Sequence, residues 1–333
     1  MTRALITGIT GMVGSHLADY LLAHTDWDIY GMLRWRSPLD NIEHLLGRIN
    51  NGDRVHLVYA DLSEEASLRH AVKAAAPDYV FHLAAQSFPQ TSFASPADTI
   101  DTNMQGTVRL LEALKDHAPA ALIHVCSSSE VYGRVAADKL PIAEDCPFAP
   151  ASPYAISKAG ADLAAQHYAA AYGMKILVSR MFTHTGPRRG DVFVESSFSK
   201  QLAMIEAGQL APVIRHGNLD SIRTITDVRD AVRAYYMLLT INPQPGQVYN
   251  IGGGTAFSVR EILNQLIGIA GVNCTLEVDP ARMRPVDADL QVPNCSKFKA
   301  HTGWEPRITY QQTMQDLLNY WRERVKNHAH LAR

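Results

Sequence analysis

The stretch that decides the fold lies near the start of the chain and reads Leu5-Ile-Thr-Gly8-Ile-Thr-Gly11-Met-Val-Gly14-Ser-His-Leu17. An apolar run comes before these glycines and a helical pattern follows them, so they occupy a turn between a strand and a helix. Such a turn lets the main chain approach a pyrophosphate at the positive end of the helix; the alternative is a purely structural turn. We predict a dinucleotide site that includes Gly8, Gly11, Met12, Val13 and Gly14.

Short apolar runs alternate with helical patterns through the first half of the chain. The runs are rich in Val, Ile and Leu and are continuous, as in strands of a parallel sheet covered on both faces. The expected strands are Arg3–Thr7, Ile29–Leu33, Val55–Tyr59, Tyr79–Leu83, Ala121–Cys126 and Lys175–Arg180. The expected helices include Gly14–Ala23, Ser63–Ala75, Thr99–His117 and Pro153–Tyr172. These repeated units predict an α/β fold with a doubly wound parallel (Rossmann) sheet.

The pattern changes after Met181. A loop rich in Gly, Pro and Arg, Thr185–Asp191, leads into helical patterns separated by single strands. The expected helices are Ser196–Gly208, Val228–Leu239, Val259–Gly271 and Tyr310–Lys326. This part has too few strands for a second large sheet, so it predicts a smaller C-terminal α+β lobe. We therefore divide the chain into a dinucleotide-binding domain, residues 1–180, and a substrate-binding lobe, residues 181–333.

The composition is that of a folded chain without a strongly charged surface. Of the 333 residues, 47% are hydrophobic and 19% are charged, and the formal net charge is −2. Such a chain can bury a sizeable core, but it has no Lys/Arg cluster suited to nucleic acid or an anionic membrane. No apolar stretch approaches the roughly 20 residues that span a bilayer, and we see no signal peptide.

The four cysteines lie far apart and form no C-x-x-C pair; they are Cys126, Cys146, Cys274 and Cys295. We therefore expect neither a metal site nor a disulfide framework. Four reduced thiols predict a cytoplasmic protein.

The end of the second predicted strand distinguishes NAD from NADP. An NAD site usually has an acidic residue there for the ribose hydroxyls, whereas this chain has Arg34, Arg36 and Ser37. A guanidinium matches a phosphate with two parallel hydrogen bonds, so these residues predict NADP with its 2′-phosphate. The alternative is that both arginines are merely solvated.

The next two strand ends complete the predicted cofactor site. The third strand ends at Asp61 and Leu62, where a carboxylate can meet the adenine. The fourth ends in small residues that let the main chain pass close to the cofactor, namely Leu83, Ala84 and Ala85.

A tyrosine and a lysine predict the chemistry. Ser152 is a good N-cap and Pro153 a good first helical residue, so Tyr154 and Lys158 lie one turn apart on one helix face. Tyrosine has an ordinary pKa of about 10, and an ammonium one turn away favours its ionised form. Such a pair alone is also common on helix surfaces.

The segment Ser127-Ser-Ser-Glu130-Val-Tyr-Gly133 ends the fifth predicted strand. The carboxyl ends of parallel strands are where α/β active sites form. Hydroxyls there can bind a sugar oxygen, and Glu130 adds a carboxyl group. The alternative for Glu130 is a solvated loop acid.

The glycine triplet, Leu83-Ala-Ala, Ser-Ser-Glu130 and Tyr154-x-x-x-Lys158, in this order and spacing, resemble the extended short-chain dehydrogenase/reductase family of nucleotide-sugar enzymes. Within that family the chain is similar to the GDP-mannose 4,6-dehydratases and the GDP-4-keto-6-deoxy-mannose reductases. The shared segments include Arg34-Trp-Arg-Ser37, Ser152-Pro-Tyr154, Gly186-Pro-Arg-Arg-Gly190, Gly217–Arg223, Arg284-Pro285 and Gly303-Trp-Glu-Pro306.

The resemblance implies a role for each site residue. Tyr154 and Lys158 would act at C4 of a GDP-sugar and contact NADP, with Ser128 orienting O4 and Glu130 as base at C5. Arg223 and Arg284 would hold the diphosphate. The other implied substrate-binding residues are Ser87, Ser129, Thr183, Arg189, Asn218 and Asp287.

Two departures affect the substrate side. The family usually has Asn where this chain has Thr183, and the segment Thr226–Asp230 is more similar to the reductases. The dehydratases usually have Thr where Ser128 stands, and a serine can make the same hydrogen bond.

The leading hypothesis is a nucleotide-sugar 4,6-dehydratase. A 4-ketosugar reductase, a 4-epimerase and a noncatalytic dinucleotide sensor remain open, although a sensor would not need an intact Tyr-x-x-x-Lys motif. As in relatives, Thr99–His117 and Pro153–Tyr172 are expected to form a four-helix contact in a homodimer or homotetramer.

Overall fold

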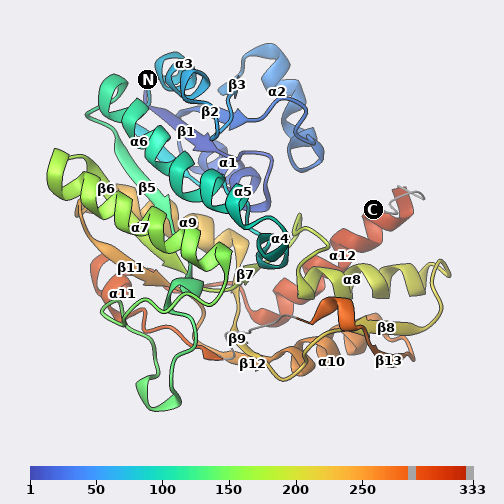
Figure 1. Ribbon diagram of the computed structural model, residues 1–333. Coiled ribbons are helices and arrows are strands. Elements are labelled where there is room, and N and C mark those ends of the chain that lie inside the picture. The colour runs from blue at the N-terminus through green and yellow to red at the C-terminus, as the bar shows by residue number, and fades with distance from the viewer. Residues whose placement is uncertain (284–289, 328–333) are drawn as a thin grey trace.

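The computed structural model describes residues 1–283 and 290–327. Within these residues the main element is a parallel sheet of seven strands in the order β11-β6-β5-β4-β1-β2-β3 (Figure 1). The strands are β1 (Arg3–Thr7), β2 (Asp28–Leu33), β3 (Val55–Tyr59), β4 (Tyr79–His82), β5 (Leu122–Cys126), β6 (Lys175–Met181) and β11 (Val248–Ile251). The strand order reverses between β1 and β4, which confirms the doubly wound sheet.

Helices cover both faces of this sheet. On one face, apolar side chains of α3 (Glu65–Ala75), α6 (Gly106–His117) and α7 (Pro153–Tyr172) form a core with Leu5 and Val80 of the strands. On the other face, α1 (Met12–His24) and α9 (Val228–Thr240) form the second core. Apart from the edge strand β3, the strands are mostly buried on both sides, which explains their continuous apolar sequences.

One strand of the sheet lies beyond residue 180 in the sequence. Strand β11 pairs with β6 in parallel, and Tyr249 and Ile251 are buried in the core that α9 shares. Its sequence, Val-Tyr-Asn-Ile, is short and carries a polar residue, so sequence analysis did not place it in the sheet. The predicted division at residue 180 is therefore not a boundary within this sheet.

The predicted helix Thr99–His117 is interrupted in the structure. It consists of α5 (Pro96–Ile100), a π turn at Asp101–Gln105, and α6. Within the turn, the side chain of Asn103 accepts a hydrogen bond from Gln86 N at 2.7 Å and donates one to Gln86 O at 2.9 Å. This tertiary contact explains a distortion that helical periodicity does not reveal.

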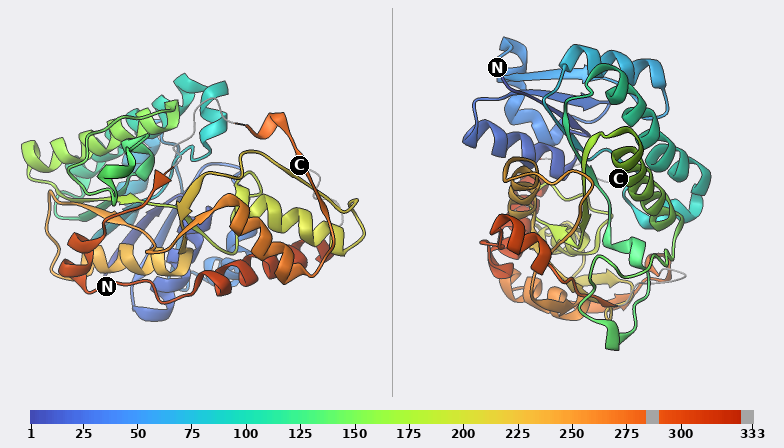
Figure 2. Two further views of the ribbon diagram at one scale, coloured as in Figure 1. Left: turned by 90° about the horizontal axis from the view of Figure 1, so that it is seen from below. Right: turned by 90° about the vertical axis from the view of Figure 1, so that its left-hand side faces the viewer.

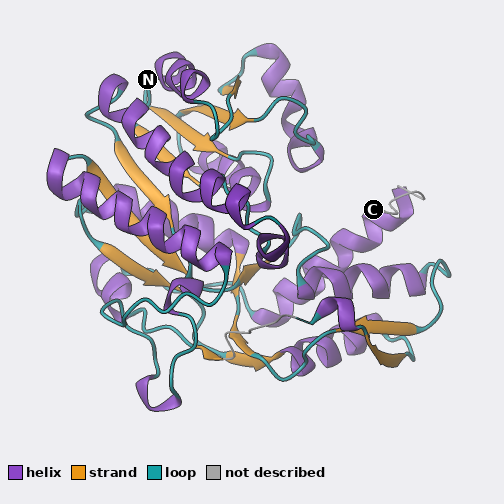
Figure 3. Ribbon diagram, in the orientation of Figure 1, coloured by secondary structure: helices purple, strands orange, loops and turns teal. Residues whose placement is uncertain are grey.

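The smaller lobe combines helices with small sheets, as predicted for an α+β lobe (Figures 2 and 3). It has its own apolar core. Phe198, Ile262 and Leu317 lie in this core. The lobe consists mainly of α8 (Val194–Glu206), β8 (Val213–His216), β9 (Ile222–Thr224), β12 (Ala256–Ser258), α10 (Val259–Ala270), β13 (Thr275–Val278), β14 (Leu290–Gln291) and α12 (Tyr310–Asn327). The remaining short elements are α2 (Leu46–Asn51), α4 (Pro89–Ala94), β7 (His184–Thr185), β10 (Thr226–Asp227) and α11 (Ser296–Thr302).

Two sequence expectations can be compared with the structure here. All four cysteines are free thiols, as predicted. None of the helices described in the structure has both the length and the apolar character needed to cross a membrane.

Candidate active site

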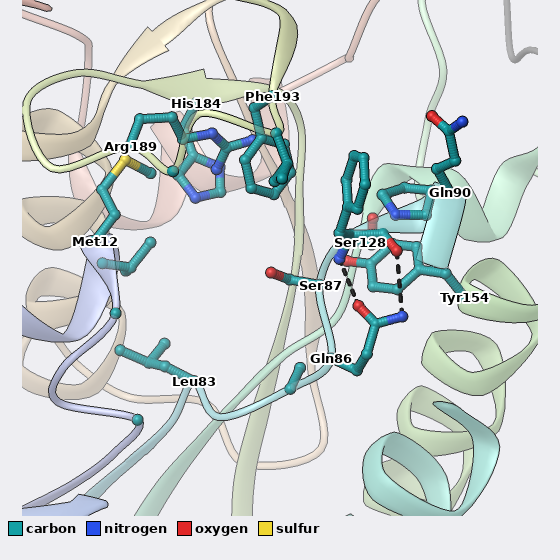
Figure 4. Close-up of a pocket in the computed structure, with 18 of the residues that line it drawn as sticks. Met12, Leu83, Gln86, Ser87, Gln90, Ser128, Tyr154, His184, Arg189 and Phe193 are labelled. Atoms are coloured by element: carbon teal, nitrogen blue, oxygen red, sulfur yellow. Dashed lines mark hydrogen bonds between the residues drawn. The ribbon is translucent and has the colours of Figure 1, made fainter. Parts of the chain in front are cut away.

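A large cavity lies where the carboxyl ends of the sheet strands meet the smaller lobe. Its volume is about 1310 Å³, and both parts of the molecule line it. Figure 4 shows Met12 and Leu83 on one side of this cavity and Ser128 and Tyr154 on the opposite side, with Arg189 grouped with His184 and Phe193 at the top of the view. The structure therefore brings the predicted cofactor, catalytic and substrate segments to one place.

The glycine loop has the shape of a phosphate cradle. Gly8 has φ +74°, and a Cβ on Gly14 would lie 2.3 Å from the carbonyl oxygen of Gly8, so there is no room for a side chain at position 14. Gly11 is the N-cap of α1 and supplies no side-chain hydrogen bond to the helix. The first amides of α1 therefore face the cavity without a side-chain cap, as an anion-binding helix end requires.

The two predicted 2′-phosphate arginines differ in position. Arg34 and Ser37 line the cavity, and Ser37 N donates to Arg34 O at 3.0 Å. Arg36 does not line it and has φ +65° in the turn between them. The sequence suggested two equivalent arginines, but this turn separates their main-chain positions, and the structure brings only Arg34 to the site.

The other strand ends also meet the cavity. The Asp61 carboxylate accepts hydrogen bonds from N and Oγ of Ser63, at 2.9 and 2.8 Å. Thr7 Oγ1 accepts from the main-chain amides of Leu83 and Ala84, both at 3.0 Å, and thereby fixes the chain after β4. The predicted cofactor residues that line the cavity at these two ends are Asp61, Leu62, Leu83, Ala84 and Ala85.

Helix α7, which carries the predicted catalytic pair, begins as predicted. Ser152 Oγ accepts a hydrogen bond from Ala155 N at 3.0 Å, and Pro153 is the first helical residue. Tyr154 and Lys158 then both line the cavity. Lys158 donates a short hydrogen bond to the main-chain carbonyl of Cys126 at the end of β5.

The protein groups around Tyr154 oppose its ionisation. Burial raises the pKa of Tyr154 above its usual value, and hydrogen bonding with Ser128 counteracts this. Glu130 raises the pKa further, whereas Arg189 lowers it. Burial also lowers the pKa of Lys158. The charged groups that shift the pKa of Tyr154 therefore include Glu130 and Arg189.

Glu130 lies on a short turn directly after β5. The turn, Ser129–Tyr132, is a 3₁₀ helix whose N-cap is Ser128, and Ser128 Oγ accepts from Glu130 N at 3.2 Å. Ser128 therefore contacts both the tyrosine and the turn that carries the glutamate. Ser128, Ser129 and Glu130 all line the cavity.

Arg189 is a cation with unused hydrogen-bonding capacity. Its guanidinium carbon lies 3.4 Å from the centroid of the Phe193 ring. Its Nε is buried and has no hydrogen-bond partner within the part of the chain that the structure describes. Burial lowers the pKa of Arg189, and Glu195 and Tyr154 oppose this effect. An anionic ligand would satisfy such a group.

The remaining predicted substrate residues that the structure describes also reach the cavity; they are Ser87, Thr183, Asn218 and Arg223. Asn218 is already engaged, because its Nδ2 donates to Ser221 Oγ at 3.0 Å. Arg223 donates from Nη1 to Ile222 O at 3.0 Å. Arg284 and Asp287 lie outside the described residues.

The cavity residues that were not predicted include His184 and Arg282. Burial, followed by the charge of Arg189, lowers the pKa of His184 to about 4, so this imidazole is neutral at neutral pH. Arg282 donates to Ser197 Oγ at 2.8 Å and pairs with Asp279 at 3.1 Å. Neither lies in a motif with a mechanistic spacing. His184 reaches the site because it lies just after β6, and Arg282 because it lies on the segment that follows β13.

Together, this doubly wound sheet, its glycine cradle and the tyrosine–lysine pair beside Ser128 define an extended short-chain dehydrogenase/reductase. Solved structures agree with this class. RMD from Pseudomonas aeruginosa complexed with NADPH has a TM-score of 0.82 at 33% identity, covering 97% of this chain and 100% of that one. The dTDP-glucose 4,6-dehydratase of Bacillus anthracis in complex with NAD has a TM-score of 0.84 at 25% identity, covering 98% of both chains.

The chain belongs to the GDP-mannose 4,6 dehydratase family, whose sequence profile matches residues 5–317. Two relatives illustrate two activities that occur among similar proteins. The GDP-6-deoxy-D-mannose reductase of Pseudomonas aeruginosa is 34% identical, covering 97% of this chain and 98% of the relative. The GDP-mannose 4,6-dehydratase of Vibrio cholerae is 32% identical, covering 95% of this chain and 92% of the relative.

Proposed function

We propose that the protein is an NADP-dependent 4,6-dehydratase that converts GDP-mannose, or a related GDP-sugar, into its 4-keto-6-deoxy product. The observation that carries this proposal is the presence of two separate bases in one cavity, Tyr154 on α7 and Glu130 on the turn after β5. A dehydratase needs both, because it must remove a proton at the C4 hydroxyl and another at C5. The family membership supports the same reaction.

The cavity fits NADP. Gly14 lets α1 pack closely against the Gly8 loop, the end of α1 without a side-chain cap suits a pyrophosphate, and Arg34 in the cavity lining suits the 2′-phosphate. Lys158 would hold the nicotinamide ribose, and the strand ends at Asp61 and Ala84 would flank the cofactor. When bound, NADP supplies a hydride acceptor for C4 and a hydride donor for C6, so no external reductant is consumed.

The residues of the chain would then share the proton transfers. Ser128 would orient O4 while Tyr154, whose ionised form Arg189 favours, removes the C4 hydroxyl proton. The ketone at C4 acidifies C5. Glu130 would remove the C5 proton and deliver it to the departing C6 hydroxyl, which leaves as water. When C6 receives the hydride, C5 would take up a proton, which balances the proton that Tyr154 took from the C4 hydroxyl. The product differs from the substrate by one water.

A 4-ketosugar reductase is the second candidate. It needs the same Tyr154 and Lys158, and the observation that favours it is the 34% identity to the GDP-6-deoxy-D-mannose reductase. A reductase consumes NADPH and needs no base at C5. The role of Glu130 therefore separates the two candidates.

The decisive experiment follows both steps in wild type and two variants. Wild-type protein should remove one water from GDP-mannose without added NADPH, as seen by mass spectrometry. Glu130→Gln should still show transient absorbance of reduced nicotinamide when substrate is added, while water loss slows by about 10² or more. Tyr154→Phe should abolish both signals.

Two other results would give different answers. Wild-type rates of water loss in Glu130→Gln would make this glutamate structural and remove the basis of the proposal. Oxidation of NADPH by a 4-ketosugar, with no water loss from GDP-mannose, would identify a reductase.

We also propose a cytoplasmic homodimer, or a homotetramer built from it, through α7 and the helical segment before it. On α7, Ile156 and Leu163 lie two turns apart and are 47% and 57% exposed, so this face is apolar in the single chain. Light scattering should show a dimer or tetramer at micromolar concentration, and Leu163→Asp should shift it toward the monomer. A monomeric wild type would refute this assembly.

A further inference from the structure

A buried polar network lies behind the two catalytic segments and has no part in the mechanism above. It consists of Tyr132, Asp162, Arg180 and Asn250. Asp162 and Asn250 are fully buried, and Tyr132 and Arg180 are 1% and 5% exposed. Burying charged and polar groups is costly unless every partner is in place, so this network holds its members in one arrangement.

The guanidinium of Arg180, on β6, is the centre of the network. Its Nε donates to Asp162 Oδ2 at 2.9 Å, and its Nη1 donates to the Tyr132 hydroxyl at 3.0 Å. The same hydroxyl donates to Asn250 Oδ1 at 2.7 Å. Burial raises the pKa of Tyr132 to about 12, so the hydroxyl keeps the proton that it donates. The side chain of Tyr132 is therefore fixed from two sides.

The two ends of the network belong to the two catalytic segments. Asp162 lies on α7, one helical turn after Lys158. Tyr132 is the last residue of the turn that carries Glu130. The contacts from Asp162 through Arg180 to Tyr132 therefore connect two elements. One is the helix that carries Tyr154, the first base, and the other is the turn that carries Glu130, the second base.

Glu130 depends on its turn more than Tyr154 does. Its carboxylate forms no hydrogen bond or ion pair with any residue that the structure describes, so the turn alone places it. Tyr154, in contrast, is held by the first turn of a 20-residue helix with its own N-cap, Ser152. A change at Tyr132 should therefore displace the second base and leave the first in place.

We propose that the network of Asp162, Arg180, Tyr132 and Asn250 is a positioning device that sets Glu130 relative to Tyr154 and Lys158, and so determines the rate of elimination. This inference rests on the proposed dehydratase function. Its members are positioning residues, because they act through Glu130 and none of them lines the cavity.

Tyr132→Phe is the sharpest test, because it removes one hydroxyl and keeps both the ring and the pair of Arg180 with Asp162. Tyr168→Phe is the matched control: its hydroxyl donates to Glu112 at 2.6 Å, between α7 and α6, and it does not line the cavity. Each variant is loaded with NADP and mixed with GDP-mannose. The measurements are the rise and decay of reduced-nicotinamide absorbance, the rate of water loss, KM and the midpoint of thermal unfolding.

Tyr132→Phe should slow water loss by about 10-fold, because a displacement near 1 Å has effects of this order or larger. The absorbance should rise at nearly the wild-type rate and decay more slowly, with KM within about twofold. Tyr168→Phe should match wild type in every kinetic measurement.

Three results would overturn the inference even if the wild type is a dehydratase. For Tyr132→Phe, they are equal slowing of hydride removal and water loss, or an unchanged rate of water loss. For Tyr168→Phe, it is slower water loss with an unchanged rise of the absorbance. If the wild type itself releases no water, the proposed function fails first and the inference falls with it.

Discussion

The two sides of the cavity are built in different ways. On the sheet side, the glycine loop and the catalytic pair stand at the ends of long regular elements, with Gly8 following β1 and Tyr154 beginning a 20-residue helix. On the lobe side, Arg189 and Arg223 come from loops and from strands of two or three residues. Regular elements fix main-chain positions closely, whereas loops leave side chains room to adjust to a ligand. The sheet side should therefore tolerate far less change.

Replacing one glycine by alanine on each side of the cavity tests this difference. The substitution on the sheet side should have the largest effect of those predicted here. A Cβ on Gly14 would lie 2.3 Å from Gly8 O, whereas a Cβ on Gly190 would lie 3.9 Å from its nearest neighbour, in the Phe193 ring. Gly14→Ala should therefore displace the loop and weaken NADP binding by about 100-fold or more.

The same measurement on the lobe side provides the control. Gly190→Ala should bind NADP within about threefold of wild type in calorimetric titration, because the added methyl meets only ordinary van der Waals distances. Equal affinities for the two variants would contradict the comparison.

The next test concerns the two arginines at the edge of the sheet side. Arg34→Ala should weaken NADP binding by about 10- to 100-fold and leave NAD binding within a few-fold, because a charge-assisted contact to the 2′-phosphate is lost. Arg36→Ala should change NADP binding by less than about threefold, since Arg36 does not line the cavity. A loss of both cofactors in parallel would argue for a general effect on the loop.

Most of the fold could be predicted because buried parallel strands have a distinct composition. The runs at Arg3–Thr7 and Val55–Tyr59 coincide with β1 and β3. The parts that were missed depend on tertiary contacts. Strand β11 pairs with β6 at the edge of the sheet, although it begins more than sixty residues after β6 ends. The π turn forms around the tertiary contacts of Asn103. Neither leaves a periodic signal.

The candidate site likewise contains residues that sequence motifs predict and residues that only tertiary packing brings together. Gly14, Ser128 and Lys158 occur in motifs whose spacing follows from helix and turn geometry, and all of them line the cavity. Arg36 was predicted together with Arg34 because residue type alone cannot reveal a turn between them. His184 and Arg282 were missed because burial and lobe packing, not spacing, bring them to the cavity.

A smaller effect concerns pH and the lobe-side histidine. The pKa of His184 is about 4 in the folded protein and near 6.5 in the unfolded chain. At pH values between these two, His184 is therefore neutral in the folded protein and takes up a proton in the unfolded chain. This lowers the free energy of unfolding as the pH falls from about 6.5 toward 4, by about 1.4 kcal/mol per pH unit. His184→Gln should remove that contribution in urea unfolding between about pH 6.5 and pH 5. An unchanged slope in His184→Gln would contradict this assignment.

The smallest effect compares two helix caps of the same chemistry, one on each side. Ser152 caps the catalytic helix through Ala155 N at 3.0 Å, and Ser258 caps α10 of the lobe through Glu261 N at 3.1 Å. Losing either cap should cost about 1 kcal/mol of unfolding free energy. Only the first cap, however, orders the turn that contains Tyr154.

Ser152→Ala should therefore also lower kcat, by about threefold to tenfold, whereas Ser258→Ala should lower the unfolding free energy alone. Urea unfolding and steady-state turnover of the two variants, measured side by side, would separate these effects. A similar loss of kcat in both would mean that catalysis follows global stability. An unchanged kcat in Ser152→Ala would mean that packing of α7 on the sheet, and not its cap, holds Tyr154 in place.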